Sequence, residues 1–255
     1  MTMLLSAPPA RTKRAVTTAL IVITGLSWAY LVFLSTRMSD MGTPFAMPMT
    51  SAWTGQQVVL MWTMWSVMMA GMMLPSAAPM ITVYARTIQT NARGLHGSTG
   101  LFVVGYLATW SCFAALATAA QWLLHDAALV DTMGVSTSRW LGGALLLLAG
   151  VYQFTAPKQA CLRQCRSPLG FLMTHWRNGR AGALVLGMHH GVVCVGCCWA
   201  LMAVLFVLGV MNLWWIALLA AGVLVEKLIP SRLITRTLGA GLVFWGAALL
   251  IGIGS

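Results

Sequence analysis

The sequence predicts an all-α fold: a polytopic transmembrane helical bundle of about seven spans, with the N-terminus in the cytoplasm. The first observation behind this prediction is composition. Of the 255 residues, 59% are hydrophobic and 7% are charged, and the mean hydropathy is +0.83. A soluble domain carries about a quarter charged residues. We therefore expect one transmembrane domain over residues 1–255, with the lipid bilayer as its surroundings.

The second observation is a series of apolar segments, because a spanning helix needs about 20 mostly apolar residues. The expected spans cover residues 15–34, 58–84, 100–123, 139–157, 181–208, 211–228 and 237–253. The last two segments are short, so a count of six spans also fits the sequence. The first segment is interpreted as a retained anchor rather than a signal peptide, because it is long for a signal peptide and no clear cleavage site follows it.

The third observation is the distribution of charge. With a cytoplasmic N-terminus, every basic residue except Arg37 and Arg139 lies in a cytoplasmic segment, and three of the four acidic residues lie outside. This asymmetry follows the positive-inside rule, and it explains the net charge of +11 without nucleic acid as a partner. The fourth acid, Glu226, ends the sixth span. It is expected to pair with Lys227 or with an arginine of residues 158–180, or to act in a proton or metal relay.

The fifth span contains the stretch "GMHHGVVCVGCCWALM", residues 187–202. On a helix, residues four positions apart share a face. The inward row is therefore expected to contain His190, Cys194, Cys198 and Met202, with Cys197 beside it. His189 points about 100 degrees away from His190. Thiolate and thioether ligands select copper(I), with zinc as a competitor where cysteine and histidine combine. Plain packing and thiol redox chemistry are the alternative interpretations.

A second cysteine pair, Cys161 and Cys165, follows the fourth span and is expected on its cytoplasmic side. If the segment is helical, both sulfurs face the same way, and the nearby basic residues Lys158, Arg163 and Arg166 favour thiolate. Such a pair suits a donor or acceptor site for a soft metal ion. The alternative is two free thiols without a role.

The second span is rich in methionine. Met64, Met68 and Met72 form one helical stripe, and Pro75 and Pro79 are expected to kink the helix. A thioether row beside a kink would suit a copper(I) path, although methionine rows often serve packing alone. The preceding loop adds further thioethers that could collect copper(I) outside the membrane, or lie on its surface as an amphipathic lid. These loop residues are Met38, Met41, Met47 and Met49.

Five sequence blocks together resemble a family of unknown function described as predicted metal-binding integral membrane proteins. The blocks are "MMAGMMLPSAAPM", "APKQACLRQCRSPLGF", "HHGVVCVGCCWALM", "GVMNLWW" and "EKLIP". The resemblance covers about residues 58–230, and its Met-Met-Leu-Pro and Cys-x-Gly-Cys-Cys-Trp elements are specific. It implies a multi-pass protein of the bacterial inner membrane with a role in metal handling.

The sequence thus favours a protein that binds or transports a soft metal ion, with copper(I) as the expected cargo. A membrane enzyme complex or a metallochaperone is the expected partner. It shows no ATPase signature such as a Walker A loop, and the chain is not expected to be an enzyme. Two alternatives remain open. One is an accessory subunit of a larger membrane complex that contains a copper enzyme. The other is a thiol-disulfide carrier that uses the Cys194-x-x-Cys197 pair.

Overall fold

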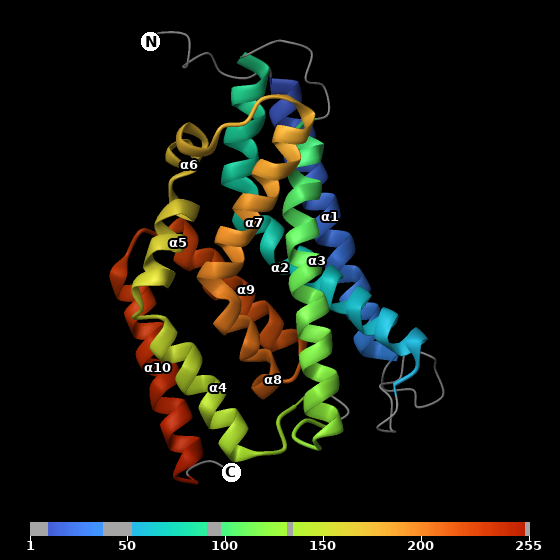
Figure 1. Cartoon of the computed structure of the whole chain (residues 1–255), viewed down its shortest axis with the longest axis vertical. Coiled ribbons are helices and arrows are strands. Elements are labelled where there is room, and N and C mark those ends of the chain that lie inside the picture. Colours follow the sequence, from blue (N-terminus) through green and yellow to red (C-terminus); the bar gives the residue numbers. More distant parts are fainter. Residues whose placement is uncertain (1–9, 38–52, 91–97, 132–134, 253–255) are drawn as a thin grey trace.

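The computed structural model of the chain describes residues 10–37, 53–90, 98–131 and 135–252, and the regular elements in these ranges are all helices. The all-α prediction is therefore confirmed. The helices are α1 (Ala10–Arg37), α2 (Gly55–Thr90), α3 (Ser98–Asp126), α4 (Arg139–Tyr152), α5 (Ala156–Arg166), α6 (Pro168–His175), α7 (Gly179–Ala203), α8 (Leu205–Leu208), α9 (Leu213–Leu228) and α10 (Arg232–Leu250) (Figure 1).

Five helical segments in the described part of the chain are long and apolar enough to cross a membrane, and they include α1, α2, α3, α7 with α8, and α10. Helices α4 and α5 would add a sixth span, although they meet at an angle of 62°. Helix α9 has 16 residues, so it measures about 24 Å, which is shorter than a hydrocarbon core of about 30 Å. The seven-span count and the cytoplasmic N-terminus remain predictions.

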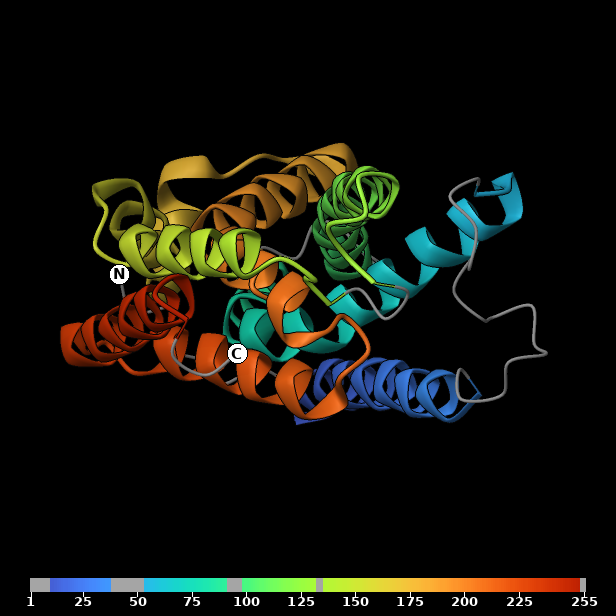
Figure 2. The ribbon, with the colours of Figure 1, turned by 90° about the horizontal axis from the view of Figure 1, so that it is seen from below.

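Many of the helices pack in pairs. Helix α3 lies along α7, α4 lies along α10, and α1 lies along α2 (Figures 1 and 2). The start of α1, the end of α2, the start of α3 and helix α6 lie at one end of the bundle, whereas α1, α3 and α10 finish at the other end (Figure 1). This arrangement is compatible with the two sides that the charge distribution predicts.

The contact between α3 and α7 depends on two glycines. A Cβ atom added at Gly187 would lie 2.0 Å from the carbonyl oxygen of Phe102, and one added at Gly105 would lie 2.2 Å from the carbonyl oxygen of Leu184. The two backbones therefore touch, as is common where small residues line membrane helix contacts. Because the helices approach so closely, Tyr106 of α3 reaches the buried face of α7.

The break between α4 and α5 turns the chain back across α7. Tyr152 ends α4, and its hydroxyl donates a hydrogen bond to the carbonyl oxygen of Gly196 on α7. A Cβ atom at Gly196 would lie 2.9 Å from the sulfur of Cys161 on α5. The absence of a side chain at Gly196 therefore makes room for α5 and for the first cysteine of the second pair.

The α3–α7 contact gives a stability prediction. We expect Gly187→Ala to lower the unfolding free energy in detergent by about 1–3 kcal/mol, the usual cost of overpacking, because the added methyl group meets backbone atoms. Gly222→Ala is the matched control, since a Cβ atom there has no neighbour within 4 Å. Denaturant unfolding followed by circular dichroism would measure both. Equal stability of the two variants would contradict the close contact.

Candidate metal centre

His190 and the three cysteines of α7 face the interior of the bundle. His190 is 3% exposed, Cys194 is 0% exposed, and the other members of the group are between 1% and 2% exposed. These other members are Cys197, Cys198 and Met202. The spacing of four residues therefore places the potential ligands on the buried side of the helix.

Side chains of α3 and α9 contact the sulfur of Cys194 on α7, and α2 is linked to it through Lys227. Lys227 of α9 donates a hydrogen bond to it over 2.9 Å, and the hydroxyl of Tyr106 on α3 lies 3.1 Å from it. The same Lys227 ammonium donates to the hydroxyl of Ser76 on α2, also over 2.9 Å. Cys194 is thus held by one cation and one phenol in an otherwise apolar interior.

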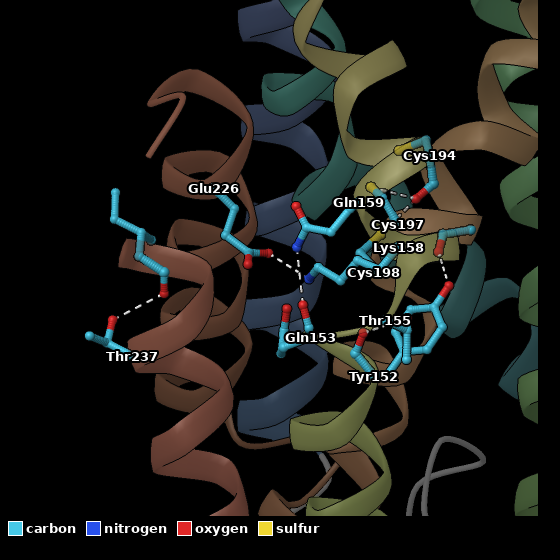
Figure 3. A network of polar contacts seen from close by, with 12 residues as sticks. Tyr152, Gln153, Thr155, Lys158, Gln159, Cys194, Cys197, Cys198, Glu226 and Thr237 are labelled. Atoms are coloured by element: carbon cyan, nitrogen blue, oxygen red, sulfur yellow. Dashed lines mark hydrogen bonds and ion pairs between the residues drawn. The ribbon is translucent and has the colours of Figure 1, made fainter. Parts of the chain in front are cut away.

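Two more thiols of α7 lie next to Cys194. The thiols of Cys197 and Cys198 donate to the carbonyl oxygen of Cys194 over 3.1 and 3.0 Å (Figure 3). The sulfur of Cys198 also lies 4.0 Å from the thioether sulfur of Met73 on α2. A thiol and a thioether from different helices are therefore in contact at the centre of the protein.

Helix α5 brings the second cysteine pair to the same place. The thiol of Cys165 lies close to the thiols of Cys194 and Cys197. Cys161 lies against Gly196 of α7, as described above, and interacts electrostatically with Cys197. The sequence indicated two separate sulfur sites, but the structure joins them into one group. We call the five residues Cys161, Cys165, Cys194, Cys197 and Cys198 the sulfur cluster.

An ion pair lies beside the sulfur cluster. The ammonium of Lys158 on α5 is 2.9 Å from a carboxylate oxygen of Glu226 on α9, and both side chains are almost fully buried (Figure 3). Arg166 donates to the carbonyl oxygen of Glu226 over 2.9 Å. The prediction that Glu226 pairs with Lys227 or an arginine side chain is therefore wrong. Consecutive helical residues point about 100 degrees apart, so Glu226 faces α5 while Lys227 faces α2 and α7.

The burial of these lysines also changes the charge assignment made from the sequence. Lys158 is 0% exposed and Lys227 is 6% exposed. Both had been counted with the basic residues of cytoplasmic segments, whereas both lie inside the bundle. They therefore belong to its interior polar network rather than to its surface.

The two adjacent histidines have different surroundings. The His190 ring packs near the rings of Phe102, Tyr106 and Phe171, and its Nδ1 atom has no hydrogen-bond partner in the described structure. The His189 ring instead lies 4.4 Å, between ring centroids, from His175 of α6. Of the two, His190 is on the same helical face as Cys194, and His189 turns toward α6.

The methionine row of α2 lies in the interior of the bundle. Met64, Met68 and Met72 are at most 1% exposed in α2. The thioether in contact with Cys198, however, belongs to Met73, which follows Met72 in the sequence and lies outside this row. Helix α2 is continuous from Gly55 to Thr90, with Pro75 and Pro79 inside it.

The four methionines expected to collect copper(I) outside the membrane lie beyond the described residues. They are Met38, Met41, Met47 and Met49.

The geometry limits the kinds of metal ion that fit. In the ranges that the structure describes, no group of three or more histidine, cysteine, aspartate or glutamate side chains is arranged to hold a metal ion. The sulfur atoms in contact are those of Cys198 and Met73, and Cys194 lies one turn earlier on the same face of α7. A set of few, soft ligands favours copper(I) over a harder ion.

Sequence reasoning assigned no role in this site to four of its participants, although it places Met73 in a second methionine stripe of α2. Lys227, Tyr106, Ser76 and Met73 all contact the sulfur atoms or the groups that hold them. A lysine at the end of an apolar span was the signal for the first, because ionisable residues within membrane segments are functional candidates. Ser76, between two prolines in an apolar helix, was a weaker signal of the same kind.

Residues 62–249 match the model of a protein family whose description is "PpoB2: Copper chaperone". The matched segment begins in α2 and ends in α10, so it includes the whole sulfur cluster together with Met73 and Lys227. No curated protein and no solved structure matches the chain.

The Lys158–Glu226 pair predicts a specific stability pattern. Glu226→Gln should lower the unfolding free energy in detergent by about 3–5 kcal/mol, because it leaves a buried ammonium without its partner. The double variant Lys158→Met, Glu226→Gln removes both charges and should recover most of that loss. Denaturant titration of the three proteins measures the effect. A double variant that is no more stable than the single one would contradict the assigned pair.

Proposed function

The chain belongs to the PpoB2 copper chaperone family, and from this membership we propose that it is an integral membrane protein that binds copper(I) through buried sulfur ligands and delivers it to a copper enzyme. One observation supports this proposal most directly. Thiols from α7 and a thioether from α2 meet in the core, where the side chains around them exclude water. Copper is the cargo of this protein rather than a resident cofactor.

We assign the cargo site to Cys194, Cys198 and Met73. Cys194 and Cys198 lie on one face of α7, and Met73 supplies a neutral third sulfur 4.0 Å from Cys198. Thiol ligands must lose their protons to bind a metal. The thiol proton of Cys198 now bonds to the carbonyl oxygen of Cys194 and would be released on binding. His190 has an unpaired Nδ1 atom nearby and is a reserve ligand for the ion in transit.

The remaining cysteines offer a route between the cargo site and the edge of the bundle. Cys165 lies close to Cys194 and Cys197, and both Cys161 and Cys165 are half-buried, whereas the three cysteines of α7 are buried. A soft ion can move along such a series by exchanging one sulfur ligand at a time. We propose that copper enters or leaves the core through Cys165 and Cys161.

The proposed setting is the bacterial inner membrane, which the apolar helices would cross as a multi-pass bundle. The receiving partner would be a membrane enzyme complex that needs copper, or a soluble metallochaperone that exchanges copper with the α5 pair. With the predicted cytoplasmic N-terminus, that pair lies toward the cytoplasmic side. Zinc would compete for the cysteines, but the described residues contain no group of three or more histidine, cysteine, aspartate or glutamate side chains arranged to hold it.

Burial favours metal binding over thiol–disulfide exchange. Exchange requires a thiolate to attack a disulfide sulfur directly, so the rate depends on access. Cys194, Cys197 and Cys198 are between 0% and 2% exposed, and a protein disulfide could not reach them without opening the bundle. A metal ion is small enough to pass along the sulfur cluster.

The cargo site predicts a loss of bound metal on mutation. We expect the purified protein, loaded with copper(I) under reducing conditions, to retain copper that the double variant Cys194→Ser, Cys198→Ser does not retain. Cys112→Ser is the matched control, because Cys112 is exposed on α3 and should leave copper retention unchanged. Elemental analysis after competition with a copper(I) chelator gives the measurement. Equal copper in the double variant and the control would contradict the assignment.

The proposed route predicts a kinetic effect without a loss of capacity. Cys165→Ser should leave the amount of bound copper unchanged, because Cys194, Cys198 and Met73 are intact. It should slow the release of copper to an external chelator several-fold, because it removes the first exchange partner. Stopped-flow absorbance of the copper–chelator complex follows the release. Wild-type release kinetics in this variant would exclude Cys165 from the route.

A further inference from the structure

Lys227 is a buried cation of the described residues that takes no part in the Lys158–Glu226 ion pair. It is 6% exposed, and its two hydrogen-bond acceptors are the sulfur of Cys194 and the hydroxyl of Ser76. Neither is a carboxylate. Glu226, the next residue along the chain, is occupied by Lys158. The groups that face the Lys227 ammonium from α2, α3 and α7 are thus a serine, a tyrosine and the sulfur cluster.

A buried ammonium without a nearby anion is costly in an apolar interior. Of the groups around Lys227, the cysteines are the ones that become anionic when they bind a metal ion. The sulfur site therefore supplies the counter-anion of Lys227 once its thiols lose their protons to bind a metal ion, and Lys227 adds one positive charge to the site. Any bound metal ion must be accommodated together with this charge.

We propose that Lys227 is a specificity-determining residue that makes the sulfur site selective for a monovalent over a divalent soft metal ion. This inference rests on the proposed function, because it takes Cys194 and Cys198 as the ligands of the cargo. Lys227 acts by its charge and position and is not itself a ligand.

The selectivity follows from charge balance. Two thiolates carry two negative charges, and a monovalent ion and the Lys227 ammonium carry one positive charge each, so the filled site is neutral. A divalent ion in the same place leaves one excess positive charge, which is unfavourable where the surroundings are apolar and nearly dry. A third thiolate ligand would remove the excess, but the cysteines of the sulfur cluster do not form a group of three or more that is arranged to hold one metal ion in the described ranges.

The test compares two soft ions that differ in charge. Silver(I) stands in for copper(I) because it does not change oxidation state under the assay conditions, and cadmium(II) is a soft divalent ion that thiolates bind well. The full-length protein in detergent is dialysed against both ions together, and the bound ratio is measured by mass spectrometry of the elements. The variants are Lys227→Gln, which keeps polar contacts with Ser76 and Cys194, Lys227→Met, and Lys227→Arg, which keeps the charge.

The proposal expects the bound silver-to-cadmium ratio to fall about tenfold or more in Lys227→Gln and Lys227→Met, and to stay close to wild type in Lys227→Arg. The double variant Lys158→Met, Glu226→Gln is the matched control, since it removes a buried lysine that touches no sulfur, and its ratio should not change. An unchanged ratio in Lys227→Gln, with silver still bound, would overturn the role of Lys227 alone. Wild-type protein that binds neither ion would instead overturn the proposed function.

Discussion

The hydrogen bond from Lys227 to the sulfur of Cys194 is the interaction on which the centre of this protein depends. It spans 2.9 Å, and the same ammonium reaches Ser76 over an equal distance. Through these two bonds α9 is fixed against α2 and α7, while Tyr106 adds α3. Because an unpaired ammonium would be unstable in this interior, helices that supply its acceptors must stay together. The cation and the sulfur site therefore stabilise each other.

Two features of the backbone make that meeting possible. Glycines at the α3–α7 contact let the helices touch, which brings Tyr106 to the cysteine face. The 62° bend between α4 and α5 then folds the second cysteine pair over α7. A straight continuation of α4 would have carried Cys165 away from Cys194. Small residues and a bend thus assemble a sulfur cluster from segments that are distant in the sequence.

Much of this architecture could be predicted, and the remainder shows where sequence patterns stop being informative. The helical class and the buried row of His190, Cys194 and Cys198 follow from hydropathy and from a spacing of four residues. The union of the two cysteine groups does not, because Thr155 and Pro157 mark the start of a new helix but do not set the direction in which that helix runs. The sequence places Lys227 with the basic residues of a cytoplasmic segment for a similar reason: its position at the end of a span is compatible with solvent, and only the neighbouring helices bury it. Met73 contacts Cys198, rather than Met64 or Met68, because of how α2 is rotated about its axis. The periodicity of the methionines alone does not determine this rotation.

The central claim is that copper(I) is held in the core by sulfur. X-ray absorption spectroscopy at the copper edge tests it most directly, on the full-length protein loaded with copper(I) under reducing conditions. We expect a first coordination shell dominated by two or three sulfur atoms. That shell should disappear when Cys194 and Cys198 are replaced by serine. A first shell made only of nitrogen and oxygen atoms, or a sulfur shell that survives both substitutions, would contradict the account.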